Sequence, residues 1–148
     1  MYKMVFLDID GTILNSQGLL DEKISKSLGK LSKKGILIGL ATGRSPTGAK
    51  IYGNLLGIDY LVTYNGALVI ANEKIIFDKQ LPAEVAQKLC EKAATLGGTY
   101  FHFQYNVSRS NHPNHYLEHL LPKAIFSLPS NLNIGAHRIT LYLDILNK

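Results

Sequence analysis

The start of the chain consists mainly of short apolar runs. Turn residues and one stretch with helical periodicity separate them. Met4 to Leu7 is an uninterrupted apolar run, which is typical of a strand buried on both faces of a parallel sheet. Ile36 to Ala41 is a second apolar run and predicts a second strand. Between them, apolar residues recur at spacings of four and three, which predicts a helix over Glu22 to Lys34 with Asp21 as its N-cap. Strand, helix and strand in this order predict a βαβ unit with parallel strands.

The same kind of pattern predicts the remaining elements. We expect a loop over Ile13 to Leu20, a helix over Pro46 to Leu56, a strand over Tyr60 to Tyr64, a hairpin of Leu68 to Ile70 with Lys74 to Phe77, a helix from Pro82 to about Leu96, a strand over Thr99 to Val107, a short helix around Tyr116 to Leu121, and a last strand over His137 to Ile145.

Two carboxylates follow the first strand. Asp8 and Asp10 are spaced i, i+2, so if the extended geometry continues they point to one side and Ile9 to the other. Gly11 allows a sharp turn and Thr12 offers a hydroxyl. The carboxyl ends of strands are where open α/β sheets bind ligands, and a divalent cation such as Mg²⁺ relieves the repulsion between close carboxylates. This pattern favours a ligand site; the alternative is an Asp-x-Asp-Gly stretch that merely caps a turn.

The stretch from Asp8 to Thr12 resembles the first motif of the haloacid dehalogenase (HAD) superfamily, Asp-x-Asp-Gly-Thr. The resemblance implies that Asp8 is the nucleophile that becomes an aspartyl-phosphate and that Asp10 is the general acid/base. It also implies that Mg²⁺ is bound by Asp8 and the backbone carbonyl of Asp10, and that Gly11 and Thr12 lie at the phosphate. A carboxylate can take a phosphoryl group covalently while a second carboxyl moves the leaving-group proton, so the chemistry is consistent.

Polar residues also follow the second and third strands. A hydroxyl at a strand end before a Gly-containing turn into a helix can donate to phosphate, as Thr42-Gly43-Arg44 would. This resembles the second HAD motif in the form typical of the Cof-like branch: Thr42 would hold the phosphoryl group with the amide near Gly43, and Arg44 would reach phosphate or hold the cap. Asn65 opens the Asn-Gly-Ala that this branch commonly has beside the phosphate, although Asn-Gly is also a common tight turn.

The resemblance implies an α/β fold with an incomplete HAD-like Rossmannoid parallel sheet and an inserted small α+β cap. We assign residues 1–80 to the core domain. From Leu81 the character of the sequence changes, and residues 81–148 resemble the cap that the Cof-like branch inserts, in a shortened form.

Two later family motifs, a lysine and an acidic Gly-Asp-x-x-x-Asp-type motif, have no counterpart in these 148 residues, and Lys148 is not assigned to the first of them. Losing one such preorganised group weakens transition-state stabilisation by ~3–4 kcal/mol or more. The family's strands beside the first strand are absent as well, so Met4 to Leu7 should leave an apolar edge exposed. We therefore predict either a homodimer through this unpaired edge or a truncated gene product or fragment.

Composition narrows the setting. The net charge of +5 is scattered rather than gathered into a basic stripe with aromatics, which argues against nucleic acid as a partner. Cys90 is the only cysteine and is expected to be buried, so a disulfide framework is excluded and a cytoplasmic setting is favoured. The N-terminus lacks the apolar stretch of a signal peptide, and no run is long enough to span a membrane.

These observations and the resemblance together predict a Mg²⁺-dependent phosphatase that hydrolyses small phosphate monoesters of the sugar-phosphate type. Two alternatives stay open: a catalytically silent remnant that binds phosphate or a partner, and a sugar phosphomutase.

Overall fold

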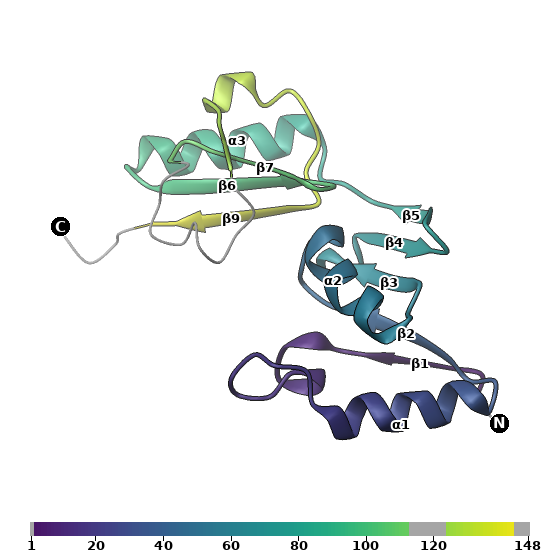
Figure 1. Ribbon diagram of the computed structural model, residues 1–148. Helices are drawn as coiled ribbons and strands as arrows, with labels where there is room; N and C mark the ends of the chain where they lie inside the picture. Colours follow the sequence, from purple (N-terminus) through teal and green to yellow (C-terminus); the bar gives the residue numbers. More distant parts are fainter. Residues whose placement is uncertain (1, 113–123, 144–148) are drawn as a thin grey trace. The chain divides into compact units, whose positions relative to one another are not determined.

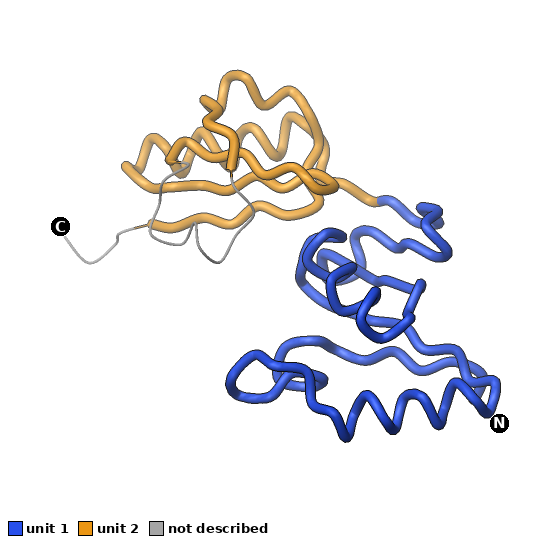
Figure 2. The backbone as a smooth tube through the Cα atoms, viewed as in Figure 1, with its two compact units in different colours: residues 1–78 blue, residues 79–148 orange. Residues whose placement is uncertain are grey.

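A computed structural model of the chain describes residues 2–112 and 124–143 (Figure 1). The chain divides into two compact units, unit 1 (Met1–Asp78) and unit 2 (Lys79–Lys148), which are coloured separately in Figure 2. The short helix expected around Tyr116 to Leu121 lies outside the described residues.

Unit 1 is built on a five-stranded sheet in the order β1-β2-β3-β4-β5. The first three strands are parallel, as the βαβ pattern predicts, and the β4–β5 hairpin adds two antiparallel strands. The elements are β1 (Met4–Leu7), α1 (Glu22–Lys33), β2 (Leu37–Ala41), α2 (Pro46–Leu56), β3 (Tyr60–Thr63), β4 (Leu68–Ala71) and β5 (Lys74–Asp78).

Local capping explains where the two helices of unit 1 begin. The Asp21 carboxylate accepts a hydrogen bond from the Lys23 amide at 2.7 Å, which confirms the predicted N-cap of α1. Ser45 does the same for α2 by accepting from the Gly48 amide at 3.3 Å, and Pro46 occupies the first turn. Helix α2 ends at Gly57, whose φ of 65° is the left-handed conformation that favours glycine.

Both helices cover the same face of the sheet. Side chains of β1, β2, β3 and β4 on that face form one apolar cluster with α1 and α2, which comprises Leu7, Ile24, Ile38, Leu40, Ala49, Tyr52, Leu56, Ile58, Leu61 and Ile70 among others. The core of unit 1 therefore lies between this face and the two helices.

The expectation that the first strand is buried on both faces is wrong for the described structure. Among the described residues, strand β1 lies at the edge of its sheet and pairs only with β2, and the side chain of Phe6 is half exposed. Burial on both faces requires a layer on each side, and α1 and α2 supply only one. The exposed apolar edge that the sequence predicts is confirmed.

Unit 2 combines one helix, α3 (Ala83–Thr95), with a four-stranded sheet in the order β8-β7-β6-β9. The helix packs on the sheet through a cluster that includes Cys90, Ala93, Tyr100 and Leu132. Cys90 is fully buried, as predicted, and burial raises the pKa of its thiol to about 12. The strands are β6 (Thr99–Gln104), β7 (Val107–Ser110), β8 (Ile125–Phe126) and β9 (Arg138–Tyr142).

The single strand predicted over Thr99 to Val107 is wrong. The chain turns at Tyr105, which has a φ of 49°, and β7 returns antiparallel to β6. The alternation of large and polar residues is the same in both strands of a hairpin, so the pattern does not mark the turn. None of the helices in residues 2–112 and 124–143 is long and apolar enough to cross a membrane.

Candidate active site

The segment after β1 presents both aspartates to solvent. The backbone stays extended at Asp8 (ψ 154°) and Asp10 (ψ 118°), so Ile9 points into the core, where it is fully buried, while Asp8 and Asp10 are exposed. This confirms the prediction that Asp8 and Asp10 point to one side of the backbone and Ile9 to the other. Gly11 then turns the chain with a φ of 76°, and the Leu14 amide donates to the Ile9 carbonyl at 3.2 Å to close the turn, which leaves Thr12 exposed.

The loop after β2 lies at the same edge of the sheet. Leu7 of β1 is paired with Leu40 of β2, so the residues that follow the two parallel strands emerge together. Thr42 is buried, and its hydroxyl oxygen accepts a hydrogen bond from the Arg44 amide at 3.2 Å. The hydroxyl proton of Thr42 remains available for donation to a ligand.

The segment after β3 is tied to this loop by backbone hydrogen bonds. The Asn65 amide donates to the Thr42 carbonyl and the Tyr64 amide to the Arg44 carbonyl, each at 3.1 Å. Tyr64 and Asn65 both adopt positive φ (51° and 56°), which is uncommon for residues other than glycine and is found preferentially at functional sites. A side chain on Gly43 would crowd the Asn65 amide group, so these two residues are in close contact.

An ion pair joins the first two motifs. The Arg44 guanidinium donates from Nε and Nη2 to the two carboxylate oxygens of Asp10, at 2.9 and 2.6 Å. This bidentate pair holds the pKa of the Asp10 carboxyl below its ordinary value, although partial burial opposes the shift. The guanidinium also lies 5.1 Å from the centre of the Tyr52 ring in α2.

The ion pair was not predicted, since Arg44 was expected to reach phosphate or the cap. Asp10 and Arg44 are far apart in sequence, and no local signal connects them. Tyr52 was missed too, because it lies within an ordinary helical pattern. All the predicted residues nevertheless come together at one edge of the sheet, after β1 (Asp8, Asp10, Gly11, Thr12), after β2 (Thr42, Gly43, Arg44) and after β3 (Asn65).

The donor set suits a hard divalent cation. Carboxylate and carbonyl oxygens are what Mg²⁺ prefers, and it commonly uses only one or two protein carboxylates together with water and substrate phosphate. Within residues 2–112 and 124–143, no group of three or more His, Cys, Asp or Glu side chains gathers at one point. Asp8 and Asp10 therefore fit Mg²⁺ as a partial ligand set.

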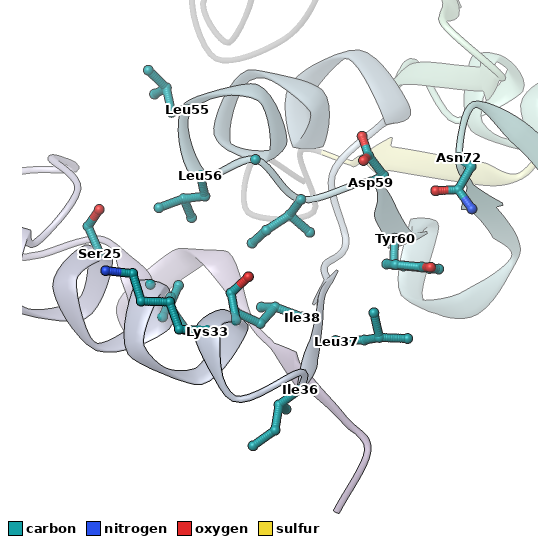
Figure 3. Close-up of a pocket in the computed structure, with 15 residues that line it drawn as sticks. Ser25, Lys33, Ile36, Leu37, Ile38, Leu55, Leu56, Asp59, Tyr60 and Asn72 are labelled. Atoms are coloured by element: carbon teal, nitrogen blue, oxygen red, sulfur yellow. The ribbon is translucent and has the colours of Figure 1, made fainter.

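A cavity of about 620 Å³ in unit 1 lies apart from these residues (Figure 3). It is formed at the amino ends of β2 and β3, between α1 and the end of α2, and its lining includes Ser25, Lys33, Ile38, Leu56, Asp59 and Tyr60. The aspartates follow the carboxyl end of β1 and do not line it. The cavity is therefore not part of the candidate active site.

Comparison with known proteins establishes the family. The model for haloacid dehalogenase-like hydrolases matches residues 5–133. This chain belongs to that family, which confirms the resemblance seen in the first two motifs.

Individual relatives match this chain over part of their own length. The Bacillus subtilis (strain 168) protein named "Putative phosphatase YkrA" is 33% identical over 91 residues, which cover 62% of this chain and 35% of the relative. The HMP-PP phosphatase of Shigella flexneri serotype 5b (strain 8401) is 35% identical over 89 residues, or 59% of this chain and 33% of the relative. The chain thus spans about a third of the length of these two relatives.

A solved structure supports the fold. A protein from Geobacillus kaustophilus HTA426 superposes with a TM-score of 0.82 at 25% sequence identity, over 96% of this chain and 58% of that one. A haloacid dehalogenase-like hydrolase from Bacteroides thetaiotaomicron superposes with a TM-score of 0.74 at 24% identity, over 89% of this chain and 53% of that one. The mixed α/β fold with parallel strands in unit 1 is therefore shared with a structure of that family.

Proposed function

We propose that this chain carries the nucleophile and the general acid/base of a phosphatase that hydrolyses small phosphate monoesters of the sugar-phosphate type with Mg²⁺. One observation carries the proposal: Asp8 and Asp10 are exposed at the carboxyl edge of the parallel sheet, where Arg44 from the second motif is bonded to Asp10. The names of the Bacillus and Shigella relatives support phosphate chemistry.

The proposed reaction has two steps, each carried by the same two aspartates. In this proposal the Arg44 guanidinium moves from Asp10 to the phosphoryl group when substrate binds, which frees Asp10 from the ion pair that lowers its pKa and lets it carry a proton. An Asp8 oxygen attacks phosphorus, the bond from phosphorus to the ester oxygen breaks, and Asp10 gives that oxygen its proton, leaving an aspartyl-phosphate. Asp10 then takes a proton from water, the water oxygen attacks phosphorus, and inorganic phosphate leaves with Asp8 restored. Bound Mg²⁺ would neutralise charge on the phosphoryl oxygens.

Residues around the aspartates have binding roles in this proposal. The Thr42 hydroxyl donates to the phosphoryl group, with backbone amides near Gly11 and Gly43 and the side chains of Thr12 and Asn65 at its margin. Arg44 is paired with Asp10 in the described structure and binds the phosphoryl group once substrate is present. Unit 2 has the α+β composition expected of a cap that selects the substrate. We further propose a cytoplasmic setting, because the single buried cysteine excludes a disulfide within these 148 residues.

The test is Mg²⁺-dependent release of phosphate from an aryl phosphate by the 148-residue chain beside two variants. Asp8→Asn removes the nucleophile and should abolish turnover, a loss on the order of a thousandfold or more. Asp59→Asn is the matched control, because Asp59 is also exposed but lies at the opposite edge of the sheet, and it should retain turnover.

Two results would contradict the proposal. Equal turnover in wild type and Asp8→Asn would exclude Asp8 as the nucleophile. No turnover in a folded wild-type chain would favour a silent protein that binds phosphate or a partner, in line with the partial metal-ligand set in the described residues.

A further inference from the structure

Arg44 carries a long, flexible side chain on a fixed backbone. Its amide donates a hydrogen bond to the Thr42 hydroxyl oxygen at 3.2 Å, and its carbonyl accepts one from the Tyr64 amide at 3.1 Å. These hydrogen bonds fix the point from which the side chain starts. They do not by themselves keep the guanidinium out of solvent, because an arginine side chain has many rotamers and this one is 35% exposed. Contacts along the side chain therefore decide where the guanidinium lies.

Helix α2 supplies contacts at two points along the Arg44 side chain. A Cβ on Gly48 would lie 3.5 Å from Cβ and 3.8 Å from Cδ of Arg44, so the aliphatic part of the side chain runs beside this glycine. One turn further along α2, the centre of the Tyr52 ring lies 5.1 Å from the guanidinium carbon. Residues four positions apart share one face of a helix, so Gly48 and Tyr52 together present one surface to Arg44.

Tyr52 is itself held in place by the core of unit 1. Its side chain is half-buried and packs against the apolar cluster between the sheet and the two helices. Its contact with Arg44 differs in kind from the contact with Asp10. A guanidinium donates hydrogen bonds to a carboxylate along its own plane, whereas an aromatic ring attracts the positive charge itself. The ring therefore does not compete with Asp10, and its contact persists when the hydrogen-bonding partner of Arg44 changes.

We propose that Tyr52, together with Gly48, is a positioning residue that keeps the Arg44 guanidinium at the candidate active site as it passes from Asp10 to the phosphoryl group. The passage to the phosphoryl group rests on the proposed phosphatase function, whereas the positioning of Arg44 beside Asp10 does not. The alternative is that Tyr52 only fills the core. Removing it would then lower stability without changing the order of the Arg44 side chain.

The first measurement is the mobility of the Arg44 side chain in the 148-residue chain, from the nitrogen relaxation of its Nε–H signal. Tyr52→Leu removes the ring, retains an apolar side chain and should mobilise the guanidinium. Tyr52→Phe retains the ring and should preserve most of the order. Tyr60→Leu is the control and should leave Arg44 ordered. Tyr60 is also a half-buried tyrosine of unit 1, but it lies at the amino end of β3, whereas Arg44 follows the carboxyl end of β2.

A second measurement shows whether Tyr52 acts through Arg44. Calorimetric titration with inorganic phosphate in the presence of Mg²⁺ compares the effect of Tyr52→Leu in the wild-type chain and in Arg44→Ala. A cation–π contact at a partly exposed site is equivalent to about a two- to fivefold change in affinity, so Tyr52→Leu should weaken phosphate binding by about this factor. It should have no further effect in Arg44→Ala, where the residue that it positions is absent. Equal weakening in both backgrounds overturns the proposal.

A variant outside the core keeps the test decisive if Tyr52→Leu does not fold. Gly48→Leu places a side chain against the aliphatic part of Arg44 and should also mobilise its Nε–H group. Gly48→Ala adds only a Cβ at ordinary contact distance and should not. A mobile Arg44 in the wild-type chain, or an ordered one in the folded leucine variants, overturns the proposal. If the leucine variants mobilise Arg44 but the wild-type chain does not bind phosphate, the positioning of Arg44 stands and the proposed phosphatase function is contradicted.

Discussion

The two sheets of this chain differ in how far they enclose their own strands. In unit 2, β6 is paired on both sides, with β7 and β9, and every residue from Thr99 to Phe103 is buried. In unit 1, β1 is paired on one side and has no fully buried residue. The strand that leads into the candidate nucleophile is thus the less enclosed one, although all four of its residues are apolar and β6 also contains Thr99, His102 and Gln104. The difference lies in what packs against each strand.

The largest expected loss of stability comes from removing an aromatic ring from the sheet of unit 2. Phe101 is fully buried, 6.4 Å from Phe103 and 5.9 Å from Tyr142 between ring centres. Phe101→Ala should destabilise unit 2 by about 3–5 kcal/mol, because it leaves a cavity. The measurement is amide hydrogen exchange in β6 and β7, which reports on unit 2 separately.

The matched substitution in the sheet of unit 1 is Phe6→Ala. It should lower the stability of unit 1 by less than about 1.5 kcal/mol, since the Phe6 ring is already half in water. Equal losses of stability in Phe6→Ala and Phe101→Ala would contradict the conclusion that the sheet of unit 1 encloses its strands less than the sheet of unit 2.

A third prediction concerns acid, and its effect on stability should be confined to unit 2. His102 is fully buried, its Nδ1 has no hydrogen-bond partner in the part of the chain that the structure describes, and its Nε2 lies 3.3 Å from the Ile134 carbonyl. Burial lowers the pKa of His102, with a further contribution from Arg109. The folded state therefore keeps the ring neutral at a pH where the unfolded chain binds a proton.

The direction of the pH dependence of stability follows from this difference in proton binding between the folded and unfolded states. Stability of unit 2 should be unaffected by His102 above its unfolded pKa of ~6.5 and should fall as the pH drops below that value, by at most ~1.4 kcal/mol per pH unit. Urea unfolding between pH 7.5 and 5 measures the slope, which His102→Gln should reduce. His112→Gln changes an exposed histidine and is the control; an unchanged slope in His102→Gln would contradict the assignment.

The smallest expected loss of stability tests whether the two units unfold independently. Asp21→Ala removes the N-cap of α1 and should destabilise unit 1 by about 1 kcal/mol, whereas Asp21→Asn retains a capping side chain and should lose much less. Hydrogen exchange in β6 should not change in either variant. A parallel change in β6 would show that the two units unfold together.

The sequence was a good guide wherever structure depends on neighbouring residues. Helices α1 and α2 begin and end close to their predicted bounds, because Asp21, Pro46 and Gly57 act within one turn of the helix ends. The placement of Asp8 and Asp10 opposite Ile9 also follows from local geometry. The hairpin at Tyr105 was missed, because a tyrosine with positive φ has no sequence signal comparable to glycine.

The sequence by itself determined the order of the helices and strands, the parallel βαβ unit, and the carboxylate and hydroxyl residues at the strand ends. Spacing and residue type encode these features directly. Only the tertiary structure decided that Arg44 binds Asp10 and that Tyr64 and Asn65 are hydrogen-bonded to the loop after β2. It also decided that one face of the unit 1 sheet has no covering layer within the described residues. Contacts between residues far apart in sequence depend on how the elements pack. A run of apolar residues shows that a strand can be buried, but the neighbouring layers determine whether it is.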